Sequence, residues 1–495
     1  MGKIIGETTN NDFRLQHPLA LLTYSKRKFW LLLIPILRRL IVYNFNVIEW
    51  ISWGLWDLLL LGLLAGIILF QYFSFRYKFN DFELIIQNNF FIKSVFKINF
   101  NKVSLLSSKE TFWSRPFRAV KLQIESEAKS AFNKRKASDV VIVTDKKTAE
   151  RVLWRFRSGS SAVKRRHTVS YKNPRSMLVI YSILFSSAYS GGIYLLILLY
   201  QSADIIAETL GIYYGEILSR FKELSENIIT GISDGLIFII VITACGYIYS
   251  FISNILRLQN YRLTIRGRLL EIKGGYFSRW SYYINRDYVN YTDIRQNMIM
   301  KIFGLYSINI GCTGYGRKRG EIPVFIPITE LPKGGAVLEM FLPGLGSELA
   351  KRKPEKRTAK TSFFKLTWLP LFLIIGFALG FSLLVYIIPN FARLYLFLLI
   401  MSEIPSALFM TACVTEYFSG GVTIDKEHRH FAVYCRKGLS QHLVIVPENK
   451  VSTIRERKTY FGKRHNISNI TIITCGERGV KHTARSVKSF ELDIL

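Results

Sequence analysis

Long apolar segments alternate with basic polar segments along this chain, and this alternation limits the possible folds more than any other feature. A stretch of about 20 apolar residues is long enough for a helix to cross a lipid bilayer. Pairs of such stretches lie within residues 17–75, 177–256 and 363–414. Polar blocks follow them at 76–176, 257–362 and 415–495. We therefore predict an α+β integral membrane protein with six transmembrane helices in three hairpins, each followed by a small β domain.

The distribution of charge predicts how these segments are oriented. The chain has a formal net charge of +32, and residues 76–176 hold 23 Lys and Arg against 8 Asp and Glu. In contrast, residues 201–234 hold two basic and six acidic residues. Because loops rich in Lys and Arg stay cytoplasmic, we expect the three β domains and both chain ends inside, with 201–234 as an extracellular segment. The positive charge also favours anionic membrane lipids as partners.

The residue types that bind metals or carry out catalysis form no recognisable pattern. The five cysteines include no CxxC pair, and no Cys and His residues have the spacing of a zinc site. The sequence EHRH at 427–430 would need a third convergent ligand, so we interpret it as a solvated turn. Neither a nucleophile–base motif nor a nucleic-acid-reading signature is present. We predict no cofactor, no metal site, no enzymatic activity and no nucleic acid partner.

Residues 261–314 have the clearest strand pattern. The apolar runs Tyr261–Ile265 and Leu269–Lys273 are separated by Arg-Gly-Arg, which predicts a β-hairpin. The run Leu305–Ile310 alternates between apolar and polar residues, which is typical of a half-buried strand. These short runs predict an antiparallel β domain.

The same four elements recur in one order in all three polar blocks. A strand with aromatic residues is followed by an apolar strand ending in a turn, then by an element with a β-branched core, and then by an alternating strand. The third element is Ile98–Val103, Ile284–Val289 and Val446–Val451. Helical runs follow at Lys147–Arg157 and Ala336–Leu342. This self-similarity indicates three copies of one domain, a small open barrel or sandwich with a C-terminal helix.

The pattern resembles the YdbS/YdbT family of membrane-flanked bacterial proteins with pleckstrin-homology-like (PH-like) domains. The resemblance is carried by Leu269–Tyr276, Ile284–Val289, Ile302–Gly314 and His17-Pro18. The three-copy layout is similar to the larger, YdbT-like members. The resemblance implies PH-like β-barrels or sandwiches, a bacterial plasma membrane location, and a non-enzymatic scaffold or binding role. It also implies a smaller YdbS-like membrane protein as a hetero-oligomer partner, and a role in cell-envelope stress or in resistance to membrane-active peptides.

A basic loop is the strongest candidate for a binding site. Arg317, Lys318 and Arg319 lie in a Gly-rich stretch between two predicted strands, and we predict that they bind a lipid headgroup or an acidic peptide. The alternative is that these charges only set the membrane topology and solvate the surface. The stretch does not have the GK[ST] ending of a phosphate-binding loop, and a strand rather than a helix follows it.

The remaining candidates lie in the apolar segments. Arg38, Arg39 and Asp57 either form an intramembrane polar group or lie near the membrane interfaces. Gly376 and Gly380 form a GxxxG motif, which predicts close helix packing. The small residues between Ser186 and Gly192 leave a second function open, in which the chain is a component of a lipid or peptide transporter or channel.

Overall fold

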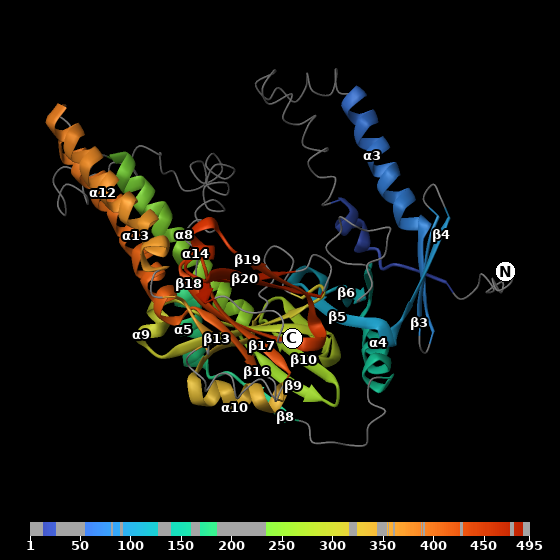
Figure 1. Ribbon diagram of the computed structural model, residues 1–495. Helices are drawn as coiled ribbons and strands as arrows, with labels where there is room; N and C mark the ends of the chain where they lie inside the picture. Colours follow the sequence, from blue (N-terminus) through green and yellow to red (C-terminus); the bar gives the residue numbers. More distant parts are fainter. Residues whose placement is uncertain are drawn as a thin grey trace.

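The protein is a row of β-sheets from which long helices project. The computed structural model describes residues 13–25, 55–80, 83–89, 93–126, 140–159, 169–185, 234–315, 324–343, 354, 356–359, 362–387, 389, 392–425, 429–475 and 480–488. Figure 1 shows helix α3 (Leu55–Ser74) projecting at one end of the row. Helices α8 (Asp234–Leu258), α12 (Phe363–Ile387) and α13 (Ala392–Ser419) project together at the other end.

Within the described residues the strands form four antiparallel sheets. The first has the order β1-β2-β3-β4, which are Arg14–Leu15, Phe75–Phe79, Glu83–Asn88 and Ser94–Asn99. The second has the order β7-β6-β5-β11-β10-β9-β8, which are Val140–Asp145, Ala119–Ser126, Val103–Glu110, Arg279–Asn285, Leu269–Gly274, Arg262–Arg266 and Val169–Lys172. The third has the order β14-β13-β12-β18-β17-β16-β15, which are Val324–Glu330, Leu305–Cys312, Val289–Gln296, Ser440–Pro447, His430–Lys437, Gly421–Asp425 and Lys356–Arg357. The last has the order β19-β20-β21, which are Val451–Arg457, Ile467–Thr474 and Lys481–Lys488.

These sheets divide into three units of one topology, and neighbouring units share a sheet. The first unit is β1–β7, the second is β8–β14 and the third is β15–β21. In each unit the first four strands form one layer and the last three form another. The second layer of one unit joins the first layer of the next, because β5 pairs with β11 and β12 pairs with β18. We call these two pairings the first and second junctions.

The first strand of each unit comes before a helical segment, and the second strand follows it. Strand β8 ends at Lys172 and pairs with β9, although α5 (Arg175–Phe185) and α8 lie between them in the sequence. Strand β15 pairs in the same way with β16, across α12 and α13. In each unit the chain therefore forms one strand of the first layer, continues into the helical segment, and then returns to form the adjacent strand of the same layer.

Short helices close the layers. Helix α4 (Lys146–Gly159) covers the core of the first unit, and α10 (Leu331–Phe341) covers the core of the second. Both helices confirm the helical runs predicted after the strands. Two one-turn helices, α9 (Met298–Ile302) and α14 (Tyr460–Arg464), connect strands within the second and third units.

The predicted hairpin and alternating strand are confirmed. Strand β9 pairs with β10 around Gly267, whose φ of 61° lies in the left-handed region that favours glycine. At the other end of β10, Gly275 has a φ of 97°, and a Cβ atom there would lie 1.9 Å from the carbonyl oxygen of Ser278. The β10–β11 turn therefore requires glycine. Strand β13 buries Ile308 and Ile310, as the alternation predicts, but it also buries Ser307 and leaves Tyr306 only partly buried. The register of its pairing with β14 shifts between Tyr306 and Ile308, which breaks the strict alternation.

The predicted fold class, with six transmembrane helices in three hairpins, is wrong. In the described part of the chain, α12 is the one helix that is long and apolar enough to cross a membrane. Helix α5 and the Gly62–Ser74 part of α3 are apolar but shorter. Helix α13, which packs beside α12, includes the charged residues Arg393, Glu403 and Glu416 in its sequence.

Apolar residues that pack on protein explain part of this difference. Leu178 and Tyr181 of α5 are buried in the core of the second unit, where the apolar pattern predicted contact with lipid. The β domains also differ from the separate barrels that we predicted, because their cores are shared. Leu269 and Tyr283 of the second unit pack in the core of the first unit, and Ile445 of the third packs in the core of the second.

Candidate functional site at the unit junctions

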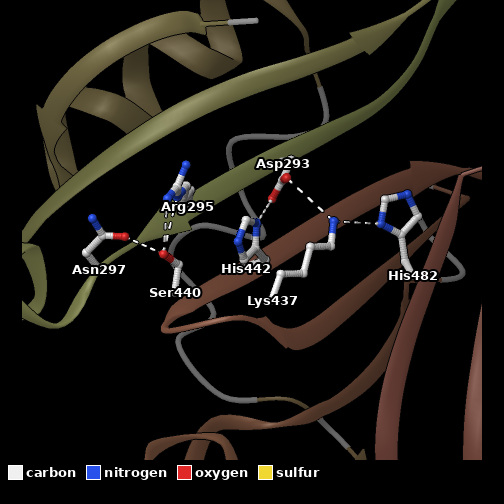
Figure 2. Close-up of polar contacts among 7 residues, drawn as sticks. All are labelled: Asp293, Arg295, Asn297, Lys437, Ser440, His442 and His482. Carbon is white, nitrogen blue, oxygen red and sulfur yellow. Dashed lines mark hydrogen bonds and ion pairs between the residues drawn. The ribbon is translucent and has the colours of Figure 1, made fainter. Parts of the chain in front are cut away.

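The second junction contains a buried group of charged and polar side chains from the second and third units. Pairing of β12 with β18 brings Asp293 opposite Val444, next to His442 on the neighbouring strand. His442 Nδ1 and Asp293 Oδ1 lie 2.8 Å apart, and both residues are buried. Figure 2 shows this pair at one end of a line of polar contacts that continues through Lys437 to His482. A buried carboxylate with a hydrogen-bonded partner costs much less to desolvate than an isolated one.

Lys437 connects this pair to His482. Its Nζ atom lies 3.7 Å from Asp293 Oδ2 and 3.4 Å from Nδ1 of His482, which is on β21 (Figure 2). Burial alone would raise the pKa of Asp293, but the hydrogen bond to His442 and the charges of His442 and Lys437 hold it below its usual value. Burial and the charge of Lys437 lower the pKa of His482 to about 4, against the opposing effect of Asp293. His482 is therefore neutral at physiological pH.

The remaining residues of the group hold Ser440. Its hydroxyl donates to Asn297 Oδ1 and accepts hydrogen bonds of 3.3 Å from Nε and Nη2 of Arg295. Ser440, His442 and Asp293 are the residue types of a hydrolase triad. In a triad, however, the serine hydroxyl bonds to the histidine, whereas the hydrogen bonds described for Ser440 go to Asn297 and Arg295. This geometry fits a structural junction that joins two units.

The first junction has a buried ionic group of its own. Glu271 on β10 lies 2.8 Å from Arg157, 2.5 Å from Lys273 and 3.6 Å from Arg266. Arg157 belongs to α4 of the first unit, so this contact crosses the junction. Its Nη2 atom also donates to the Tyr283 hydroxyl at 2.6 Å.

The pKa values at the first junction reflect this arrangement. Burial alone would raise the pKa of Glu271, but the hydrogen bond from Lys273 and the charges of Lys273, Arg157 and Arg266 lower it. Burial and the neighbouring Glu271 raise the pKa of Tyr283 to about 12. Both junctions therefore combine a sheet pairing with a buried carboxylate whose charge is stabilised by nearby cations.

An exposed aromatic cluster lies at one end of the first junction. It contains Phe112 and Trp113 from the β5–β6 connection and Tyr276 and Phe277 from the β10–β11 turn. The ring centroids of Phe112 and Phe277 are 6.1 Å apart, and Arg115 donates a 2.6 Å hydrogen bond to the carbonyl of Tyr276. Phe112, Tyr276 and Phe277 are each about half exposed, and Trp113 is 80% exposed.

The second junction exposes apolar residues at the corresponding place. They are Ile299, Ile302 and Phe303 in and after α9, and Leu439 in the β17–β18 turn. Because α9 is the β12–β13 connection, these residues occupy the positions that the aromatic cluster occupies in the preceding unit. Exposed apolar groups of this kind mark surfaces that contact a membrane or another protein.

Most of the predicted site residues lie outside the described part of the chain. This applies to Arg317–Arg319 and to Arg38 and Arg39, and Asp57 lies in α3 but its side chain is not described. Cys312, at the end of β13, and Tyr315 are buried immediately before the basic loop. The roles predicted for these five basic residues and for Asp57 stay predictions.

The other predicted residues can be placed. Gly376 and Gly380 lie in α12, and apart from the neighbouring backbone of α12 itself no described atom comes within 4 Å of where their Cβ atoms would be. The predicted packing role thus stays a prediction and requires a partner other than the described residues. His430, which we placed in a solvated turn, is instead buried at the start of β17, 4.0 Å from Asp425. In the described residues no group of three potential ligands could hold a metal ion.

Sequence reasoning missed the junction residues and the strands that precede the helices. The alternating sequence Val169–Lys172 was the available signal for β8, and the two-residue strands β1 and β15 give none. Glu271, Asp293 and His442 lie within strands, and no local sequence signal marks their charges as buried. Asp293 and His442 lie where strands of two units pair, and Glu271 contacts Arg157 of the preceding unit.

Comparison with known proteins decides the family. Residues 30–159 and 209–338 match the family model described as bacterial PH domain, and together they make up just over half of the chain. The chain belongs to the bacterial PH domain family. The two PH domain matches contain β2–β7 and β9–β14, so they account for the first two units. The recurrence of the same strand order in the third unit is an observation of the structure.

A similar curated protein is the transmembrane protein YdbT of Bacillus subtilis (strain 168). It is 24% identical over 326 residues, which are 62% of this chain and 64% of the length of YdbT. No solved structure matches the chain. The resemblance predicted from the sequence is confirmed, and the chain is a bacterial PH domain protein similar to a transmembrane protein.

Proposed function

We propose that this protein is a non-enzymatic, membrane-bound scaffold whose PH-like units lie against the cytoplasmic face of the bacterial plasma membrane. The observation that carries the proposal is the exposed aromatic cluster of Phe112, Trp113, Tyr276 and Phe277. Tryptophan and tyrosine are the residues that favour the boundary between lipid and water. Arg115 beside them supplies a cation that can meet the phosphates of lipid headgroups.

The position of the cluster relative to the helices supports this function. The backbone N–H groups of Gly275 and Tyr276 donate to the carbonyls of Gln259 and Leu256, at 2.8 and 3.0 Å. The β10–β11 turn is thereby bonded to the C-terminal end of α8. A bilayer that receives the projecting helices would meet the cluster at its surface, because both lie at this end of the sheets.

The third unit is also linked firmly to its helix. Glu416 in α13 lies 2.6 Å from Arg436 in β17, and both side chains are buried. Arg436 also stacks over the Phe409 ring of α13, at 5.0 Å. Since α13 leads directly into β16, we expect a bound membrane to fix the orientation of the third unit and, through the second junction, of the second unit.

The test measures how close the aromatic cluster comes to lipid. The full chain, with exposed Cys245 and partly exposed Cys475 replaced by serine, is reconstituted into vesicles that contain a nitroxide-labelled lipid. A fluorescent label is placed at Trp113→Cys or, as a matched control, at Arg268→Cys. Arg268 is also exposed, but it lies in the β9–β10 turn at the opposite end of strand β10. We expect the nitroxide to quench the label at position 113 strongly and the label at 268 weakly. Equal quenching at the two positions would contradict the proposal.

Three finer elements of the function are also proposals. The excess of Lys and Arg supports the cytoplasmic orientation of the units. The similarity to YdbT leads us to propose a small YdbS-like membrane protein as partner and a role in envelope stress or in resistance to membrane-active peptides. Affinity purification from native membranes tests the partner, and peptide sensitivity of a deletion strain tests the role. A purified complex without a second PH-like membrane protein would argue against the partner.

The transporter alternative depends on the small residues at 186–192. These residues lie outside the described part of the chain, so no structural observation favours a conduit. The transporter function would be supported if proteoliposomes containing the protein showed flux of a lipid or peptide, and if bulky substitutions of Gly191 and Gly192 abolished that flux.

A further inference from the structure

The two junctions are formed by equivalent strands in the same register. In each unit a three-residue 3-10 turn separates the last strand of the first layer from the first strand of the second layer. At the first junction, Tyr283, two residues before the end of β11, pairs with Leu106, three residues after the start of β5. At the second, Ile445, two residues before the end of β18, pairs with Thr292, three residues after the start of β12. The same pairing rule is therefore used twice.

One strand of each type has no partner among the described residues. Strand β4 is the edge of the first sheet and is equivalent to β11 and β18. Strand β19 is the edge of the last sheet and is equivalent to β5 and β12. In Figure 1, β4 lies at the α3 end of the row and β19 lies well away from it. The two complementary edges therefore do not meet within one chain.

Exposure distinguishes these edges from their paired equivalents. Five of the eight residues of β5 and five of the eight of β12 are buried, whereas β19 has no buried residue. Strand β4 also has no buried residue, and Val95 on it is 52% exposed. Neither strand contains proline, a residue that commonly blocks a sheet edge. Charge is no bar to pairing here, because Asp293 and Arg295 of β12 lie inside the second junction.

We infer that β19 of one molecule pairs with β4 of a second copy of this chain, in the register of the two internal junctions. The rule pairs Lys97 with Ile454, Phe96 with Arg455 and Val95 with Glu456. Lys97 then lies diagonally across from Glu456, within reach of its carboxylate. The contact continues the interface already present twice in the molecule, so the occupant of each edge is a copy of the same fold.

This contact is heterologous, because it joins two different surfaces. Each added copy presents the same two edges again, so the assembly grows along the membrane or closes into a ring. A second copy on the same membrane has its helices in the same orientation as the first. The proposed pairing is compatible with this, because the two internal junctions use the same antiparallel register to join units that have the same orientation. The inference rests on sheet edges and does not depend on the lipid contact of the aromatic cluster.

The test is disulfide cross-linking between two differently tagged copies in native membranes. Cys245 and Cys475 are replaced by serine in both copies, one of which carries Val95→Cys and the other Glu456→Cys. Residues directly opposite each other across two strands lie close enough for a disulfide, whereas a displacement of two or three residues moves the Cα atoms beyond bridging distance. We expect mild oxidation to give at least about fivefold more cross-linked product than the displaced pair Val95→Cys with Thr453→Cys or Lys458→Cys.

Charge substitutions at the exposed Val95 provide an independent readout. Val95→Asp faces Glu456 and should reduce co-purification of the two tagged copies severalfold, whereas Val95→Lys should not, because like charges opposite each other repel. Adding Glu456→Lys to Val95→Asp should restore it. The inference would be overturned if cross-linking were no greater than in controls where only one of the two copies carries an introduced cysteine. It would also be overturned if the displaced pairs cross-linked as well as Val95→Cys with Glu456→Cys. A cross-linked product at position 95 that contains a different protein in place of a second copy would overturn it as well.

Discussion

The third unit should lose stability in mild acid because of His482. This side chain is fully buried, lies 3.4 Å from Lys437 and packs against the ring of Tyr291 at 4.7 Å. Its pKa in the folded protein is about 4, against 6.5 for an ordinary histidine. Between these values the unfolded segment binds more protons than the folded one, so stability falls as the pH falls. The stabilising effect is fully present above pH 6.5.

The magnitude follows from the two pKa values. Each unit of pKa difference corresponds to roughly 1.4 kcal/mol, so the complete loss is about 3 kcal/mol, and about 2 kcal/mol of it has occurred at pH 5. The assay is hydrogen exchange by mass spectrometry on the full chain in detergent, at pH 7.5 and 5. Exchange rates are corrected for their intrinsic pH dependence, and protection is measured in peptides from β17, β20 and β21.

The comparison with His482→Gln isolates the contribution of this histidine. Glutamine is polar and does not titrate, so the native chain should lose roughly 30-fold more protection than the variant between the two pH values. Asp293 and the other carboxylates titrate in both chains and cancel. His465→Gln is the matched control, because His465 is exposed on the same unit, and it should behave like the native chain. If the native chain and His482→Gln lose equal protection, then burial of a neutral histidine does not control this region.

Three further results follow from the structure. Glu271→Gln should destabilise the first junction by about 3 kcal/mol, because it removes the carboxylate that balances buried cations. Loss of hydrogen-exchange protection in β10 and α4 would check this. In the native chain the same protection should weaken as the pH falls toward and below the usual pKa of a glutamate. Gly275→Ala should disrupt the β10–β11 turn, because the new methyl group would overlap a backbone carbonyl. Lipid nitroxide should then quench the fluorescent label at Trp113→Cys less strongly. Gly267→Ala, whose methyl group would face open space, should have a smaller effect through φ strain alone. Replacing Arg317–Arg319 with alanine in the full chain should weaken its binding to an acidic peptide, as measured by fluorescence anisotropy; unchanged binding at low salt would leave these charges a topological role only.

The choice of the full chain for the last experiment comes from the junctions. Residues 257–362 were predicted from the sequence as a separate domain, but β11 pairs with β5 and β12 pairs with β18. An excised segment would expose both of those edges and part of its shared core.

Local sequence patterns predicted single elements well and their partners poorly. The Arg-Gly-Arg turn identifies the β9–β10 hairpin because the loop length itself sets the register. No such local signal exists for the pairing of Tyr283 with Leu106, which are far apart in the chain, or for Val169 with Ile265 across two helices. Apolar content also cannot distinguish lipid from a protein core, and α5 demonstrates this, since Tyr181 contacts the second unit. The burial of Glu271 and Asp293 could not be recognised from the sequence either, because local composition does not show which side chains the fold covers.

The shared sheets impose an order in time on the growing chain. Glu110 at the end of β5 pairs with Arg279, which the ribosome adds about 170 residues later, roughly 10 to 30 s afterwards. During that interval the β5 edge of the first unit's second layer stays uncovered while the intervening apolar segments are made. An exposed edge in a newly made chain is a site for wrong pairing. The sheet of the first unit can therefore be completed only after α5 and α8, which precede β11 in the sequence, have been made. Folding of the first unit is in this way coupled to the folding of the helices that follow it.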